Sequence, residues 1–261
     1  MPVWLFFLWV SAAFLALRGK FFSLPQGRFR ISITGFQLSG AFLLYLFSGI
    51  TIALLSSNNN GKESSPFIQG CFITTVLVLY LYSLPQKTIH TVLWAGGSSG
   101  RSLKKLFNTT LRAWILAVPI TQLSSLILSK ILASVFDEKF LTPQAIAKEV
   151  QEGLSTPLTS SLLLIVSVAI LLPISEEIVF RGFLQNFLKK RFSIRKSLVL
   201  SSVLFSLAHV ENSLGSLVFV PVIFILSLMI GFVYEKERSL VAPMLLHTLY
   251  NGSQLAFSRW L

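Results

Sequence analysis

Apolar residues along this chain come in long blocks that short polar stretches separate. The blocks lie near residues 2–17, 36–56, 67–84, 111–133, 158–188, 197–210, 215–233 and 240–258. Most of them approach the roughly 20 residues that an α-helix needs to cross a bilayer. Strands of a membrane barrel alternate apolar and polar residues over about ten positions, which is not the pattern here. The sequence therefore predicts an all-α, polytopic transmembrane helical bundle of about eight helices.

Two features make the helix count open. The first block is short, and the block at 197–210 is shorter than a full span. Seven spans, with 197–233 forming one broken hairpin, is the alternative.

Within the block at 158–188, Pro173 removes one amide donor and frees a backbone carbonyl. This predicts a kink or a widened helical turn near that residue.

Composition supports a membrane protein and argues against a nucleic-acid-binding one. The 261 residues are 53% hydrophobic and 12% charged, with a mean hydropathy of +0.73, whereas soluble domains carry roughly 25% charged residues. The net charge of +12 resides in particular loops between apolar blocks, without the basic, aromatic-interleaved stripe of a nucleic-acid surface. We expect the lipid bilayer, and no nucleic acid, as a partner.

The loop charges alternate along the chain. The loops near 18–30, 87–105 and 189–196 are strongly basic, and the loops between them are not. The positive-inside rule then places the basic loops in the cytoplasm and both termini outside. The first block lacks a basic leader and a small-residue cleavage site, which predicts an uncleaved first helix.

Ionisable residues interrupt three of the last four apolar blocks. Each such charge costs about 2.5–3.5 kcal/mol at the centre of a bilayer, so their repetition predicts a polar site within the membrane. Counted at 1.5 Å per residue from the basic loop at 189–196 and from the charge-balanced loop near Ser239, the key side chains lie roughly 12–20 Å deep on three helices. These residues are Glu176, Glu177, Arg181, His209, His247 and Asn251.

Helical spacing predicts how these side chains face. Positions four residues apart share a helix face, so Glu177 can pair with Arg181, and His247 lies on one face with Asn251. Glu176 is rotated by about 100° from Glu177 and is expected to face elsewhere, free to act chemically.

Three motifs follow one another on successive apolar blocks. They are Glu176-Glu177-x-x-x-Arg181, Phe205-x-x-x-His209 and His247-x-x-x-Asn251. Together they resemble the signature of the CPBP family of CAAX proteases and bacteriocin-processing enzymes, also called the Abi family of intramembrane glutamic endopeptidases. The similarity is to the type II CAAX prenyl endopeptidases and covers roughly residues 158–255. We therefore expect one integrated membrane domain, in which residues 1–157 form N-terminal transmembrane helices and residues 158–258 form the catalytic core.

The resemblance implies a role for each matched residue. Glu176 is the expected general base that activates a water, which His209 holds or shares. His247 and Asn251 are the expected oxyanion hole. A desolvated carboxylate suits a base, and imidazole and amide groups are suitable oxyanion donors. The supporting residues that the family implies are Glu177, Arg181 and Phe205.

The family further implies hydrolysis, without a cofactor, of membrane-associated proteins or peptides, including lipidated ones. Short loops and a compact length favour a bacterial inner (cell) membrane, with the active-site cavity towards the cytoplasm. A zinc-dependent protease is an alternative, because two histidines and a glutamate can bind zinc with one open position. The chain lacks an HExxH helix, so we favour a site without metal.

Two non-proteolytic functions remain as alternatives. An immunity or scaffold protein could keep the polar cluster for partner binding. A transporter could use buried Glu and His side chains as a proton relay.

Overall fold

Helices make up all the regular structure in the part of the chain that the computed structural model describes. That part comprises residues 7–12, 14, 21–25, 31–57, 66–95, 102–135, 158–210 and 216–257. No strand occurs within these ranges. The predicted all-α bundle is therefore confirmed.

The helices fall into two groups along the chain. The first group is α2 (Gly35–Ser57), α3 (Pro66–Ser83), α4 (Gln86–Trp94) and α5 (Leu103–Val135). The second begins with one continuous helix over 158–188, followed by α10 (Ile194–Leu207), α11 (Ser216–Glu237) and α12 (Val241–Phe257). The parts of the continuous helix are α7 (Leu158–Val166), η2 (Ser167–Leu171), α8 (Leu172–Glu177), η3 (Ile178–Gln185) and α9 (Asn186–Leu188).

Most predicted helices are confirmed to within a few residues, and two differ. Helix α4 occupies a segment that the sequence analysis assigned to a loop, and the residue after its end, Ala95, adopts the left-handed conformation. Helix α5 begins at Leu103 instead of near residue 111. Of the predicted helix at 2–17, only residues 7–12 and 14 lie within the described part, and they are helical.

The continuous helix has π-helical turns on both sides of Pro173, and these confirm the widened turn predicted near that residue. The π-helical segments are η2 and η3. Helix α3 supports the first of them: Ser167 Oγ donates to the Pro66 carbonyl at 2.6 Å, and Thr74 Oγ1 donates to the Leu171 carbonyl at 2.8 Å. π-Turns inside α-helices are frequent at functional sites.

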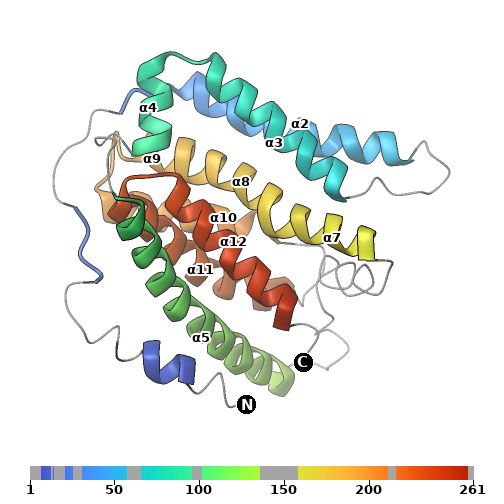
Figure 1. Cartoon of the computed structure of the whole chain (residues 1–261), viewed down its shortest axis with the longest axis vertical. Coiled ribbons are helices and arrows are strands. Elements are labelled where there is room, and N and C mark those ends of the chain that lie inside the picture. The colour runs from blue at the N-terminus through green and yellow to red at the C-terminus, as the bar shows by residue number, and fades with distance from the viewer. Residues whose placement is uncertain are drawn as a thin grey trace.

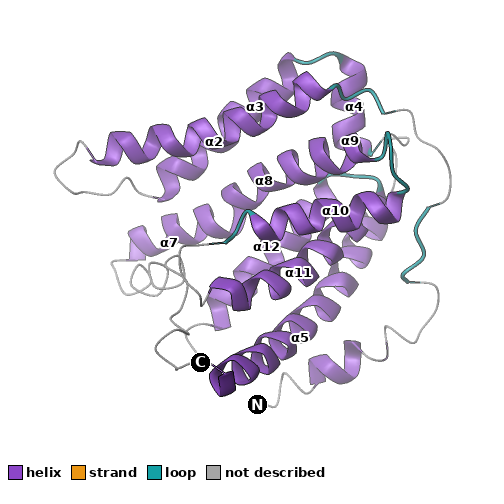
Figure 2. Cartoon of the chain, turned by 180° about the vertical axis from the view of Figure 1, so that it is seen from behind, coloured by secondary structure: helices purple, strands orange, loops and turns teal. Residues whose placement is uncertain are grey.

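The helix over 158–188 lies between two groups of helices (Figures 1 and 2). On one side α2 and α3 run side by side, and α3 packs along η2 and α8. On the other side lie α10, α11 and α12, with α5 packed against α11 and α12. Elements from both halves of the chain thus pack on one central helix.

Polar contacts fix α12 against α5. Tyr250 donates its hydroxyl hydrogen to Thr121 Oγ1 at 3.0 Å, and Gln122 Nε2 donates to Gln254 Oε1 at 2.8 Å. Both contacts lie close to Asn251 in sequence. The position of α12, which carries the last motif, is therefore set by α5 as well as by the central helix.

Four described helices are long and apolar enough to cross a membrane: Pro66–Ser83, Leu103–Val135, Leu158–Leu188 and Phe219–Glu237. Helix α10 has 14 residues, in agreement with the short block predicted there. Large apolar side chains such as Leu79, Leu126 and Leu204 lie exposed on the outside of the bundle, where lipid tails can cover them. The chain is an integral membrane protein.

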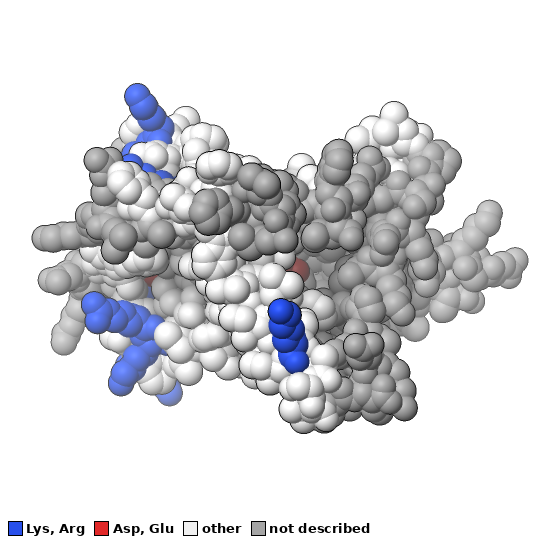
Figure 3. Space-filling model, turned by 90° about the horizontal axis from the view of Figure 1, so that it is seen from below, with Lys and Arg blue, Asp and Glu red and all other residues white. Residues whose placement is uncertain are grey.

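Basic side chains gather at one end of the bundle (Figure 3). That end carries the turns before α4, after α9 and between α11 and α12. The described basic residues there include Lys87, Lys190, Arg191 and Arg238. One further basic side chain lies over the middle of the face shown in Figure 3.

Candidate active site

The three motifs come together in space on three helices. Glu176 and Glu177 end α8, His209 follows α10 directly, and His247 and Asn251 lie on α12. Side-chain contacts join five of the residues that the sequence singled out into one cluster, while Asn251 contacts the same central helix at Val168. The five are Glu176, Glu177, Arg181, His209 and His247.

Glu176 lies between the two histidine rings. Its Oε1 is 3.9 Å from His209 Nε2, and its Oε2 is 3.8 Å from His247 Nε2. These distances are too long for direct hydrogen bonds and suit groups that a water molecule bridges. The Glu176 side chain is 14% exposed, the His209 side chain 33% and that of His247 only 5%. The cluster is therefore most open on the His209 side.

The outer nitrogen of each ring has a fixed partner. His209 Nδ1 lies 2.8 Å from the Phe205 carbonyl oxygen, which can only accept a hydrogen bond. His247 Nδ1 lies 2.8 Å from Glu177 Oε1. Both Nδ1 atoms therefore carry a hydrogen, and both Nε2 atoms face Glu176. A neutral ring in this tautomer presents Nε2 as an acceptor.

The two adjacent carboxylates lie next to the same imidazole ring. We expected Glu176 to face away from Glu177, but the two groups approach opposite nitrogens of His247. The 100° rotation between neighbouring helical residues brings them to different sides of one ring that α12 inserts between them. The sequence alone did not reveal this arrangement, because it depends on the packing of α12 against α8.

The predicted pair of Glu177 and Arg181 is present and fully buried. Arg181 Nε lies 3.3 Å from Glu177 Oε2, as an ion pair without a hydrogen bond between these atoms. Arg181 Nη2 donates to the Ser227 carbonyl at 3.1 Å and to Ser227 Oγ at 2.9 Å. Ser227, on α11, is a supporting residue that the sequence analysis missed.

Phe205 forms an aromatic wall behind both histidines. Its ring centre lies 4.6 Å from that of His209 and 6.0 Å from that of His247. The Arg181 guanidinium carbon lies 4.5 Å from the same ring centre, in a cation–π contact. Phe205 thus contacts three charged or titratable groups, which agrees with the packing role implied for it.

Asn251 points to the central helix. Its Nδ2 donates to the Val168 carbonyl at 3.0 Å. His247 and Asn251 share a face of α12, as their spacing predicted, but each has its own partner on the central helix.

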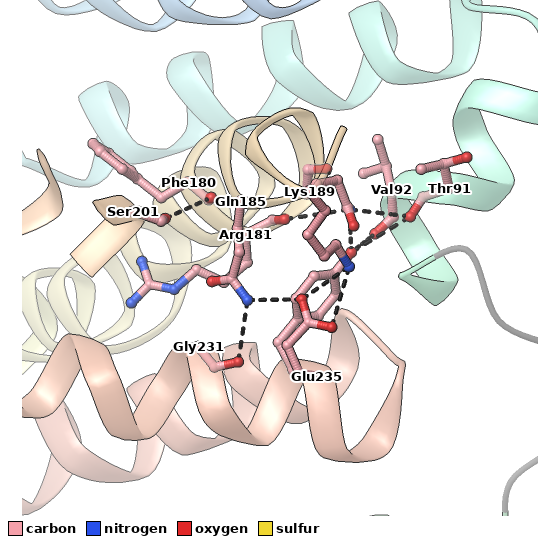
Figure 4. A network of polar contacts seen from close by, with 12 residues as sticks. Thr91, Val92, Phe180, Arg181, Gln185, Lys189, Ser201, Gly231 and Glu235 are labelled. Carbon is pink, nitrogen blue, oxygen red and sulfur yellow. Dashed lines mark hydrogen bonds and ion pairs between the residues drawn. The ribbon is translucent and has the colours of Figure 1, made fainter. Parts of the chain in front are cut away.

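A ladder of buried polar contacts continues from the site towards the basic end (Figure 4). On the central helix and at its end, the contributing side chains recur every four residues. Each contacts the α11 residue that lies 46 positions later in the sequence. At Gly231 an added Cβ would lie 2.8 Å from Gln185 Oε1, so a larger residue would require the end of the Gln185 side chain to shift. The three pairs of the ladder are Arg181–Ser227, Gln185–Gly231 and Lys189–Glu235.

The last pair of the ladder is a buried ion pair. Lys189 Nζ lies 2.9 Å from Glu235 Oε1, which also accepts from Gln185 Nε2 at 2.9 Å. Burial lowers the pKa of Lys189, and the Glu235 charge opposes this shift.

Tyr234 donates to the Val92 carbonyl at 2.8 Å and thereby joins α11 to α4. The four-residue repeat Glu177, Arg181, Gln185, Lys189 is the sequence signal for this ladder, and the sequence analysis used only its first two residues.

In the described part of the chain, no three His, Cys, Asp or Glu side chains are arranged to hold a metal ion. The two Nε2 atoms nevertheless lie 3.9 and 3.8 Å from a Glu176 carboxylate oxygen, so a test of the activity includes a zinc chelator.

Residues 158–253 match the protein-family model described as Rce1-like, type II CAAX prenyl endopeptidase Rce1-like. No curated protein matches the chain, and no solved structure does. The matched residues begin with the central helix and end on α12, so they contain every residue of the cluster around Glu176. The predicted resemblance to the CPBP family is confirmed for this segment.

Proposed function

Residues 158–253 form a domain of the Rce1-like family of type II CAAX prenyl endopeptidases, and from this we propose that the protein is an intramembrane endopeptidase. It hydrolyses peptide bonds of membrane-associated proteins or peptides, lipidated ones among them, with a water that Glu176 activates. The observation that supports this most strongly is the placement of Glu176 between His209 Nε2 and His247 Nε2 at water-bridging distances.

The first step of the proposed reaction is attack by water. Glu176 and the bare Nε2 of His209 both accept hydrogen bonds, so one water can donate a hydrogen to each of them. Its oxygen lone pair then faces a substrate carbonyl that enters on the more exposed His209 side. Glu176 takes one proton as the water oxygen bonds to the carbonyl carbon. The same carboxyl group later gives this proton to the leaving amine nitrogen.

The second requirement is stabilisation of the oxyanion. Asn251 has two amide hydrogens, and Val168 accepts one of them. The other is available to the developing oxyanion. His247 can donate from Nε2 only when both ring nitrogens carry hydrogens, because Nδ1–H is held by Glu177. The role of Glu177 is then to balance the charge of a doubly protonated His247.

The charge distribution supports one orientation in the membrane. Under the positive-inside rule, we propose that the end of the bundle with the basic turns faces the cytoplasm. The ladder from Arg181 to Lys189 runs from the site to this end. We place the protein in a bacterial cell membrane, with the site reached from the cytoplasmic side.

The test is a peptidomic comparison of membranes that contain the wild-type protein or Glu176→Gln, each with and without a zinc chelator. We expect new peptide termini that depend on Glu176 and persist in chelator. Loss of these termini in chelator would instead establish a zinc-dependent protease. Identical termini under all conditions would exclude proteolysis and favour an immunity or scaffold function.

Asn251→Ala is expected to slow cleavage by about 10²–10³-fold, because an oxyanion donor contributes in the transition state. The loss should appear in kcat, with KM little changed. Ser253→Ala, on the same helix but bonded to Trp114, is the matched control and should keep the wild-type rate. A wild-type rate for Asn251→Ala would remove this residue from the oxyanion hole.

A further inference from the structure

The widened turn before Pro173 leaves one carbonyl group without an amide partner in its own helix. The Leu172 amide donates to the Ser167 carbonyl, five residues back, as in a π-turn. In an α-helix the same amide would bond the Val168 carbonyl. The next amide in the chain belongs to Pro173, which has no N–H. Neither the α-helical nor the π-helical hydrogen-bond pattern therefore supplies a donor to the Val168 carbonyl from within the helix.

Asn251 fills this position from α12. Its Nδ2 donates to the Val168 carbonyl at 3.0 Å, across 83 residues of sequence. An unpaired buried carbonyl costs about 1–3 kcal/mol. The hydrogen bond from the Asn251 side-chain amide to Val168 removes this cost and is therefore stabilising. An amide NH₂ has two hydrogens at fixed angles, so a bond through one of them also directs the other.

We propose that Pro173 is a positioning residue for Asn251. By removing the amide that would otherwise satisfy Val168, it reserves this carbonyl for the Asn251 side chain and so orients the second amide hydrogen towards the reacting carbonyl. Pro173 is buried and acts through the helix backbone. The inference rests on the proposed peptidase function.

Pro173→Ala tests this directly, because alanine restores an N–H that can donate to the Val168 or the Ala169 carbonyl. Released from Val168, Asn251 loses its orientation, and misplacement of a group by about 1 Å can slow a reaction by about 10²-fold. We expect kcat to fall by about 10–10²-fold with KM unchanged. Thermal stability should stay equal or rise, because the variant gains a backbone hydrogen bond.

A double-mutant cycle distinguishes positioning of Asn251 from a general effect on the helix. Pro173→Ala combined with Asn251→Ala should be no slower than Asn251→Ala alone, because the proline acts only through the asparagine. Pro221→Ala, at a proline inside α11, is the matched control and should retain the wild-type rate. Pro173→Ser, which also restores the N–H, should reproduce the loss if Pro173→Ala proves unstable.

Two outcomes would overturn the inference. A wild-type rate in both Pro173 variants would show that Asn251 needs no free carbonyl. Losses that multiply in the double variant would show that Pro173 acts on another part of the site. Either result leaves the proposed peptidase function intact, whereas that function fails if the wild-type protein and Glu176→Gln give the same termini.

Discussion

Replacing Glu176 by glutamine is expected to reduce cleavage by about 10³-fold or more, because general bases contribute about 10²–10⁴-fold and a glutamine amide cannot take the proton of a water. Glutamine has the shape of glutamate and can still bond a water between the two rings. Substrate binding and folding should therefore be preserved. The measurement is the rate of appearance of a new terminus in a peptide that the wild-type membranes cleave.

Glu237→Gln provides the matched control for this substitution. Glu237 is buried and lies at the basic end, where its Oε1 accepts a hydrogen bond from Thr109 at 2.9 Å. Glutamine can accept the same bond, so this variant should cleave at the wild-type rate. His209→Ala, which removes the second acceptor for the water, should be as inactive as Glu176→Gln. Full activity of Glu176→Gln would end the assignment of Glu176 as the base.

The sequence predicted the parts of the fold that depend on hydrophobic block length. The helix over 158–188 was recovered with its bounds, and Pro173 indicated the widened turn within it. Helix α4 was missed because its segment, QKTIHTVLW, is short and has polar residues at five of its nine positions. It forms because Ile89 and Val92 bury one face against the bundle, an effect that depends on tertiary packing.

For the site, motif spacing predicted which residues gather but not which atoms they present. The pair of Glu177 and Arg181 follows from the four-residue repeat of a helix. The contact of Glu177 with His247 connects α8 to α12, and no local pattern encodes it. The same holds for Ser227, which supports Arg181 from α11. Contacts within one helix can be predicted from sequence, whereas those between helices need the packed structure.

Arg181→Met is expected to destabilise the protein by about 3–5 kcal/mol, the usual effect of breaking a buried ion pair. Arg181 and Glu177 are both fully buried. Methionine keeps much of the arginine's length and apolar contact with Phe205, but it leaves the Glu177 carboxylate without its guanidinium. Denaturant unfolding in detergent micelles, followed by tryptophan fluorescence, measures the change in free energy.

Adding Glu177→Gln to Arg181→Met separates the charge effect from lost packing. The double variant has no uncompensated carboxylate at this position, so it should recover most of the lost stability. It should still cleave slowly, because glutamine cannot balance a doubly protonated His247. A destabilisation of Arg181→Met below about 1 kcal/mol would contradict the bracing role. Charge compensation of Glu177 would then rest on His247 alone, through the 2.8 Å contact with Nδ1.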